Sequence, residues 1–156
     1  MDESLIRKLL EDLKNPDELI RNRATEQLWQ IWFLEKGTTG LEAIKNSENL
    51  LKNGELTQAE AVLNKLIEDL PDFAEAWNRR AVLYYTLGQY KQAAKDCEMV
   101  LKINPFHFGA WHGLGLCHAV LLEYRKAILA FQKALEIQPY SLQNQRLILE
   151  CTARLS

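Results

Sequence analysis

Histidine and cysteine are the residue types here best able to bind a metal or act as nucleophiles, and several cluster between positions 107 and 118: His107, His112, Cys117 and His118. A zinc site needs pairs of such ligands at suitable spacing on one face. His112 stands five positions before Cys117 and six before His118, so the three do not share a helix face. We therefore expect no metal site, no cofactor and no catalytic residue. A regulator or enzyme that binds a metal or small molecule through His112, Cys117 and His118 stays open as an alternative.

Three glycines in the same segment, Gly109, Gly113 and Gly115, suggest a phosphate-binding loop. Such a loop requires a strand before it and a helix after it. These glycines instead flank Trp111 inside an apolar, helix-like stretch. The pattern therefore favours close packing of neighbouring helices, even though each glycine costs a helix up to about 1 kcal/mol relative to alanine.

The elements that must position these residues repeat with a period of 34 residues. Identical residues recur at that spacing: Trp77 and Trp111, Tyr90 and Tyr124, Ala93 and Ala127, Pro105 and Pro139. The match extends one period earlier, where Gly54 precedes Gly88 and Pro71 precedes Pro105. A fixed period of this length is typical of stacked supersecondary units.

The repeated unit resembles the tetratricopeptide repeat, which reads Trp-x2-Leu-Gly-x2-Tyr, then Ala-x3-Phe, then Pro. The best-matching unit contains Trp111, Leu114, Gly115, His118, Ala127, Phe131 and Pro139. The unit before it contains Trp77, Arg80, Ala81, Tyr84, Ala93, Cys97 and Pro105. An earlier, degenerate unit contains Ala43, Asn46, Ser47, Leu50, Ala59, Leu63 and Pro71. The resemblance covers roughly residues 40–141.

The resemblance implies an all-α solenoid of antiparallel helix hairpins. We expect the following segments: an N-terminal helical hairpin over 1–37, a degenerate first repeat over 40–73, a second over 74–107, a third over 108–141, and a capping helix over 142–156. His118 then takes the tyrosine place of the repeat and Cys97 the phenylalanine place, so we expect both to be packing residues.

Local signals place the helix ends. Residue pairs with capping-box spacing are Thr39 with Glu42, Thr57 with Glu60, and Asp72 with Glu75. We expect Gly54 and Gly88 to adopt the left-handed conformation that ends a first helix. The segment 15–18, Asn-Pro-Asp-Glu, predicts an N-cap with proline at the first helical position, followed by a helix that reaches Glu35 and stops at Gly37.

An aromatic group, Trp29, Trp32 and Phe33, lies on that second helix. Its helical spacing with Leu28 and Ile31 favours packing onto the first repeat as an N-terminal cap. The alternative is an exposed patch that binds a partner or makes the chain a self-associating structural protein.

Charge and cysteine content limit the class of protein. The net charge is -2 and the isoelectric point is about 6.0, so we expect neither nucleic acid nor an anionic membrane as partner. Three widely spaced cysteines argue against a disulfide framework and for a reducing compartment. We expect no signal peptide and no membrane span, and thus the cytoplasm, or a reducing organelle lumen if a transit peptide is removed.

The family resemblance also implies a function. First helices of tetratricopeptide units line a concave groove that holds a peptide or helix of another protein. The groove positions of this chain are Lys45, Glu48, Lys52, Glu75, Asn78, Arg79, Val82, Tyr85, Thr86, Gly109, His112, Gly113, Leu116 and Val120. We therefore expect a non-enzymatic scaffold, an adaptor or assembly factor.

One subgroup of the family binds the acidic tails of heat-shock chaperones through a carboxylate clamp of Lys, Asn and Arg. At the clamp positions this chain has Ile44, Glu48, Arg79, Gly109 and Gly113. None matches, so the sequence predicts that a chaperone tail is not the partner.

Overall fold

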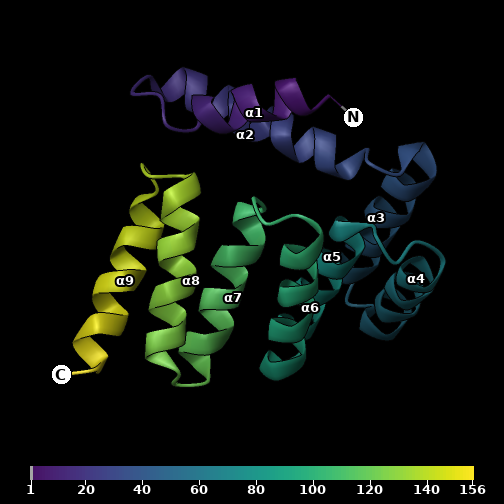
Figure 1. The fold of residues 1–156 in the computed structure, drawn as a ribbon. Coiled ribbons are helices and arrows are strands. Elements are labelled where there is room, and N and C mark those ends of the chain that lie inside the picture. The colour runs from purple at the N-terminus through teal and green to yellow at the C-terminus, as the bar shows by residue number, and fades with distance from the viewer. Residues whose placement is uncertain (1) are drawn as a thin grey trace.

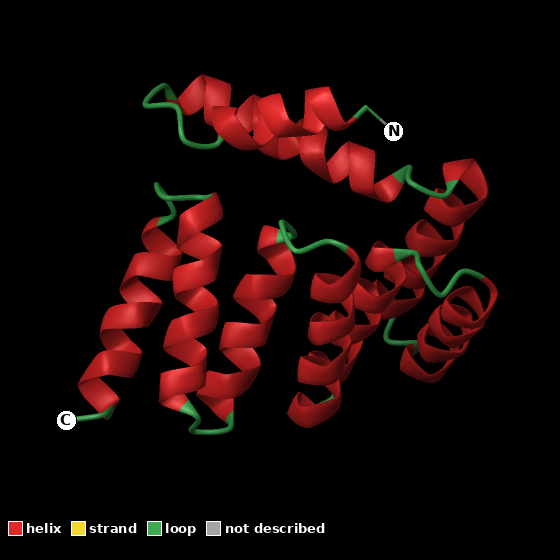
Figure 2. Cartoon of the chain, in the orientation of Figure 1, coloured by secondary structure: helices red, strands yellow, loops and turns green. Residues whose placement is uncertain are grey.

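The computed structural model describes residues 2–156, so only Met1 of the expected N-terminal segment lies outside it. Within that range the chain forms nine helices and no strand (Figure 2). They are α1 (Glu3–Asp12), α2 (Glu18–Phe33), α3 (Gly37–Lys52), α4 (Leu56–Asp69), α5 (Ala74–Thr86), α6 (Tyr90–Ile103), α7 (Phe108–Val120), α8 (Tyr124–Ile137) and α9 (Leu142–Arg154). The expectation of an all-α solenoid is confirmed.

Helices α3 to α9 stand side by side in a curved row, and consecutive helices pack against one another (Figure 1). Helices α1 and α2, here called the N-terminal hairpin, do not continue this row. They lie across the upper ends of the row's helices in Figure 1 and run from the α3 side toward α8 and α9. None of the helices in residues 2–156 has the length and apolar character that crossing a bilayer requires.

Helix pairs within the row are joined by the same turn. Gly54 and Gly88 have φ angles of +76°, as expected for the left-handed residue after a first helix. The next amide closes each turn, since Glu55 N–H donates to Leu50 O at 2.8 Å and Gln89 N–H donates to Tyr84 O at 2.8 Å. The prediction of glycine-terminated first helices is thus confirmed.

The predicted capping boxes are wrong. Helix α3 begins at Gly37 and α4 begins after Glu55, so Thr39 and Thr57 lie inside helices. Helix α5 has Phe73 at its N-cap and no side-chain cap, while Asp72 binds Lys36 Nζ at 2.7 Å. The i, i+3 spacing of a capping box also occurs inside helices, and here the preceding turn decides where each helix begins.

The entry to α2 is also shifted from the prediction. Asp17, rather than Asn15, is the N-cap, and its carboxylate accepts the Leu19 N–H at 2.9 Å. Pro16 therefore precedes the cap instead of filling the first helical position. Helix α2 ends at Phe33, and the left-handed Gly37 (φ +72°) opens α3 rather than closing α2.

Large rings pack against small residues in the core of the row. A Cβ placed on Gly115 would lie only 2.4 Å from Phe131 Cε1, so α7 and α8 approach as closely as they do because residue 115 is glycine. Ala81, Ala93 and Ala127 are also buried. The close helix packing predicted at Gly115 is confirmed.

A hydrogen bond that the repeat pattern does not predict fixes both tryptophans of the repeat. Trp77 Nε1 donates to Pro71 O at 2.9 Å, and Trp111 Nε1 donates to Pro105 O at 2.8 Å. Each indole thereby holds the proline turn that precedes its own helix.

Candidate binding groove

A cavity of about 260 Å³ opens between α5 and α7. Its walls combine apolar surface with a few polar groups and are formed by Asn78, Ala81, Val82, Tyr85, Thr86, Cys97, Gly109, His112, Gly113, Leu116 and Cys117. Most of the groove positions expected on α5 and α7 therefore converge on one cavity. Gly109 and Gly113, one helical turn apart, present no side chain to it.

The groove residues expected on α3 lie elsewhere. Lys45 and Lys52 are exposed. Glu48 Oε1 binds Arg79 Nη1 at 3.0 Å, and the two residues line a second, shallow hollow between α3 and α5. Val120 borders a third hollow, against α9. The expected groove is thus divided, and its centre is the α5–α7 cavity.

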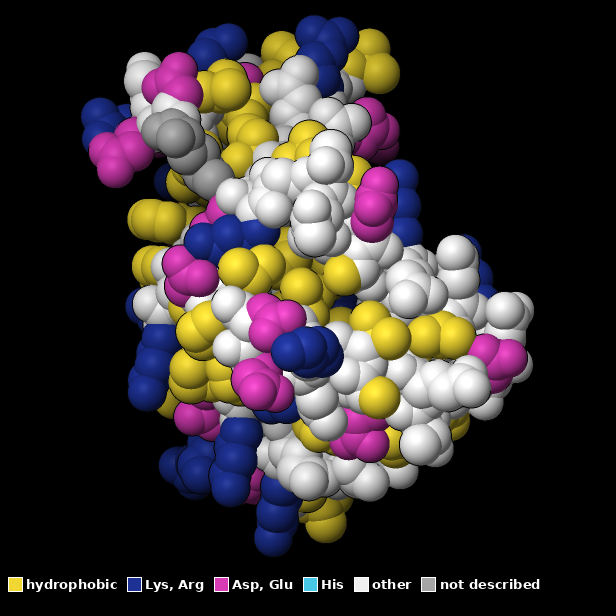
Figure 3. Space-filling view, turned by 90° about the vertical axis from the view of Figure 1, so that its right-hand side faces the viewer, with side chains coloured by type: hydrophobic (Ala, Val, Ile, Leu, Met, Phe, Trp, Pro, Cys, Tyr) yellow, Lys and Arg dark blue, Asp and Glu magenta, His cyan; other side chains and the backbone are white. Residues whose placement is uncertain are grey.

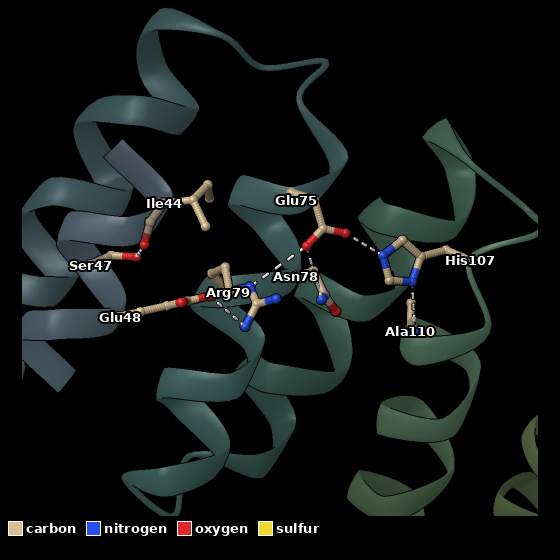
Figure 4. Close-up of polar contacts among 8 residues, drawn as sticks. All are labelled: Ile44, Ser47, Glu48, Glu75, Asn78, Arg79, His107 and Ala110. Atoms are coloured by element: carbon tan, nitrogen blue, oxygen red, sulfur yellow. Dashed lines mark hydrogen bonds and ion pairs between the residues drawn. The ribbon is translucent and has the colours of Figure 1, made fainter. Parts of the chain in front are cut away.

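Glu75 does not face the groove, and its assignment as a ligand-binding residue is wrong. Its side chain is fully buried, and Oε1 lies 2.5 Å from His107 Nε2 (Figure 4). The other carboxylate oxygen is 3.5 Å from Asn78 Nδ2 and 3.6 Å from Arg79 Nε. Glu75 thus joins α5 to the start of α7 inside the protein.

His107 is a structural residue that sequence reasoning did not single out for this role. It is the N-cap of α7, and its Nδ1 accepts the Ala110 N–H at 3.0 Å. An accepting Nδ1 carries no proton, so the proton of the neutral ring is on Nε2, which faces Glu75. The repeat period could have predicted this role. Residue 107 stands 34 positions after Phe73, which is the N-cap of α5, so it occupies the N-cap position of the next unit.

The aromatic group of α2 covers this buried pair. The Trp32 ring stacks on the His107 ring with centroids 4.6 Å apart, and Trp29 meets it edge-on at 5.1 Å. Trp29 Cη2 would lie 2.8 Å from a Cβ at Gly109, so glycine lets the indole approach α7. The N-terminal hairpin therefore rests on the beginning of the third repeat.

The sequence-based placement of these rings is thus only partly right. Phe33 does pack against the core of the first repeat, but Trp32 packs with Phe108 of the third. Trp32 is only 4% exposed, and Trp29 and Phe33 are half-buried. Trp32 is thus not part of an exposed patch.

The three residues of the metal-site or enzyme alternative point to different partners. His112 Nδ1 lies 2.7 Å from Asn144 Oδ1 on α9, and His118 Nδ1 lies 3.1 Å from Glu123 Oε1. Cys117 is buried in the core cluster that holds Cys97. In residues 2–156, no group of three or more His, Cys, Asp or Glu side chains is arranged to hold a metal ion.

Charge at the α3–α4 end of the row is mixed in sign. Figure 3 shows acidic and basic side chains interspersed on the face that presents the α3–α4 end of the row. Arg80 is committed to the interior, where its Nε and Nη2 bind the two oxygens of buried Asp96 at 2.8 and 2.9 Å. Burial raises the pKa of the Tyr85 hydroxyl, so this residue stays a neutral hydrogen-bonding group at the groove.

The chain is similar in sequence to known proteins built from helical repeats. The Tetratricopeptide repeat family model matches residues 74–107 and 109–141. A TPR repeat-containing protein of Rhizobium etli is 38% identical over 77 residues, which are 49% of this chain and 38% of the relative. The Hsp70-Hsp90 organizing protein of Triticum aestivum is 27% identical over 90% of this chain and 24% of its own length. This chain therefore spans well under half the length of either relative.

Among solved structures, the first TPR domain of Spaghetti (RPAP3), bound to the HSP90 peptide SRMEEVD, superposes with a TM-score of 0.71. The match covers 74% of this chain and 91% of that domain at 19% identity, a likeness of fold.

These comparisons contradict the sequence-based exclusion of a chaperone tail as partner. The similar domain holds an HSP90 peptide, and the wheat relative is named for Hsp70 and Hsp90. The exclusion rested only on the residue types at assumed clamp positions, one of which, Arg79, is a cation paired with Glu48. With its repeated helix pairs and its two matched units, the chain contains tetratricopeptide repeats at residues 74–107 and 109–141.

Proposed function

We propose that this chain is a protein-interaction scaffold that binds an extended peptide of a partner protein in the α5–α7 cavity. The observation that carries the proposal is the convergence of α5 and α7 side chains on one cavity of about 260 Å³. Its apolar wall suits one apolar side chain of a peptide, and its size is close to that of small ligand pockets. No catalytic role is proposed.

Polar groups at the cavity could hold the peptide backbone. The Asn78 amide, the Thr86 hydroxyl and the His112 ring all border it and can exchange hydrogen bonds with N–H and C=O groups. Tyr85 adds a stiff aromatic surface of the kind that anchors interfaces. An extended segment that inserts one apolar side chain fits this arrangement.

For the partner, we propose the acidic C-terminal tail of a heat-shock chaperone as the first ligand to test. The support is the likeness to a domain that holds the peptide SRMEEVD and to a relative named for two such chaperones. Lys45 and Lys52, exposed on α3, are cations that attract an acidic tail.

The test is fluorescence anisotropy with labelled SRMEEVD peptide and a scrambled peptide of the same composition. We expect saturable binding of the first only. Tyr85→Ala should weaken binding by about thirtyfold, corresponding to roughly 2 kcal/mol for an anchor residue. Leu129→Ala, exposed on α8 and away from the cavity, is the matched control and should bind as the wild type does.

Arg79 is left unchanged in this design because it contacts both Glu48 and buried Glu75. Unchanged affinity in Tyr85→Ala would overturn the α5–α7 site. Failure of the chaperone peptide, with retained capture of another peptide that Tyr85→Ala weakens, would overturn the ligand assignment alone.

A further inference from the structure

Two cysteines from adjacent helices meet at the floor of the α5–α7 cavity. Cys97 lies on α6 and Cys117 on α7, helices that pack directly against each other. Both belong to one core cluster and both line the cavity. The third cysteine, Cys151, lies on α9 and borders a different hollow.

Gly113 stands one turn before Cys117 on α7 and lies next to the Cys97 sulfur, since a Cβ at Gly113 would be 3.3 Å from Cys97 Sγ. Each is almost completely covered in the folded chain, with exposed fractions of 2% for Cys97 and 1% for Cys117. A partner protein cannot reach them. The cavity nevertheless gives a small neutral molecule a route to both sulfur atoms, because both cysteines line it and Gly113, next to the Cys97 sulfur, presents no side chain.

The pair is chemically asymmetric. The neighbouring Cys97 thiol lowers the pKa of the Cys117 thiol, because an S–H donor stabilises a thiolate. The same interaction, together with burial, raises the pKa of the Cys97 thiol. Since the thiolate is the reacting form of cysteine, Cys117 is the sulfur expected to react first.

We propose that Cys97 and Cys117 form an oxidisable dithiol, which small peroxides reach through the α5–α7 cavity and convert to an intramolecular disulfide. The Cys117 thiolate attacks one oxygen of hydrogen peroxide, the O–O bond breaks, and hydroxide leaves, giving a sulfenic acid. The Cys97 sulfur then attacks the Cys117 sulfur, the S–O bond breaks, and the departing oxygen takes the Cys97 proton as water. Both thiols are oxidised and one peroxide is reduced to two waters.

This modification would link the second repeat to the third. Helix α6 closes the second unit and α7 opens the third, and the two helices pack against each other. A covalent bond there would restrict motion between the two walls of the cavity. The inference does not depend on the proposed function, because it concerns the thiols and not the peptide.

The experiment treats the folded full chain with stoichiometric hydrogen peroxide, followed by alkylation of free thiols under denaturing conditions and intact mass spectrometry. We expect the loss of two hydrogen atoms and one remaining alkylated cysteine, mapped by peptide analysis to Cys151. The variant Cys151→Ser should form the same disulfide. Cys97→Ser should stop at oxygen addition, because no neighbouring thiol is left to displace it.

Access through the cavity is tested separately. Val82 is 43% exposed and lines the cavity, so Val82→Trp should slow oxidation several-fold. Val120→Trp is the matched control, since Val120 is 42% exposed but borders another hollow, and it should oxidise at the wild-type rate. A disulfide that involves Cys151, a disulfide that forms only in urea, or no loss of hydrogen would each overturn the proposal.

Discussion

The imidazole of His107 and the carboxylate of Glu75 face each other with Nε2 and Oε1 2.5 Å apart, although 32 residues separate them in sequence. Both side chains are fully buried. The pair joins the first helix of the second repeat to the first helix of the third, beneath the two tryptophans of the N-terminal hairpin. It is a structural contact, and we expect its loss to lower the free energy of unfolding rather than the affinity for a partner.

Removal of one partner should therefore destabilise the fold strongly. His107→Ala leaves the Glu75 carboxylate buried without its closest partner and removes the N-cap acceptor of α7. We expect a loss of about 3–5 kcal/mol in the free energy of unfolding, measured by urea denaturation. Glu98→Ala, exposed on α6, is the control and should stay within about 0.5 kcal/mol of wild type. A shift for His107→Ala no larger than that of the control would show that the pair contributes little.

Glu35 provides a pH-dependent prediction. Burial raises the pKa of its carboxyl above the ordinary value of 4.5, with Asp72 and Glu75 acting in the same direction. A raised pKa means that the folded chain holds this proton more tightly than the unfolded chain does. Its contribution to stability is therefore complete below pH 4.5 and is lost as the pH rises through the raised pKa.

Glu35→Gln should thus match the wild type in melting temperature in acid and exceed it at neutral pH. Thermal unfolding followed by circular dichroism across this range measures the difference. The exposed substitution Glu98→Gln controls for the loss of one negative charge. If the advantage of Glu35→Gln were constant with pH, the titration of this carboxyl would not be its cause.

The period of 34 residues predicted the tertiary contacts within the row because equivalent residues pack in the same way in each unit. Trp77 and Trp111 therefore make the same bond to the preceding proline turn, and Gly54 and Gly88 have the same φ angle. Helix starts were predicted less well. A Thr or Asp followed three residues later by Glu is compatible with a cap and with a helix interior, and only the turn geometry distinguishes them.

The candidate site could be predicted where a residue's position on its own helix determines which way its side chain faces. Val82, Tyr85 and His112 are such residues, and all three line the cavity. It could not be predicted where a distant segment intervenes. Glu75 lies on the same helix as Tyr85, but His107 and the N-terminal hairpin cover it. That pairing of α2 with α7 has no periodic signature, because the hairpin lies outside the repeat.

Leu122 stands 34 residues after Gly88 and occupies the same turn position as Gly54 and Gly88. It has the same left-handed backbone conformation, with φ of +64°. That conformation costs a residue with a side chain roughly 1–2 kcal/mol. Leu122 is 70% exposed, so its side chain contributes little burial in return. Leu122→Gly should therefore raise the free energy of unfolding by up to about 1 kcal/mol, since glycine's greater freedom in the unfolded chain offsets part of the gain.

Chemical denaturation measures the effect of Leu122→Gly directly. Leu129→Gly is the contrasting variant, because Leu129 is similarly exposed but lies inside helix α8. It should lose about 1 kcal/mol, the usual cost of glycine in a helix interior. Equal destabilisation by the two substitutions would mean that the turn after α7 does not strain residue 122.

The last prediction compares two glycines of α7 that differ in their surroundings. A Cβ at Gly115 would lie 2.4 Å from the buried ring of Phe131, whereas a Cβ at Gly113 would meet only the Cys97 sulfur, at 3.3 Å. Gly115→Ala must push α7 from α8 or turn the Phe131 ring, and should cost roughly 1–3 kcal/mol. Gly113→Ala gains helix propensity of up to about 1 kcal/mol and needs only a small shift of one thiol. Urea denaturation should therefore find Gly113→Ala the more stable variant. The reverse order would mean that Phe131 yields more easily than Cys97, and that the close approach of α7 and α8 does not depend on Gly115.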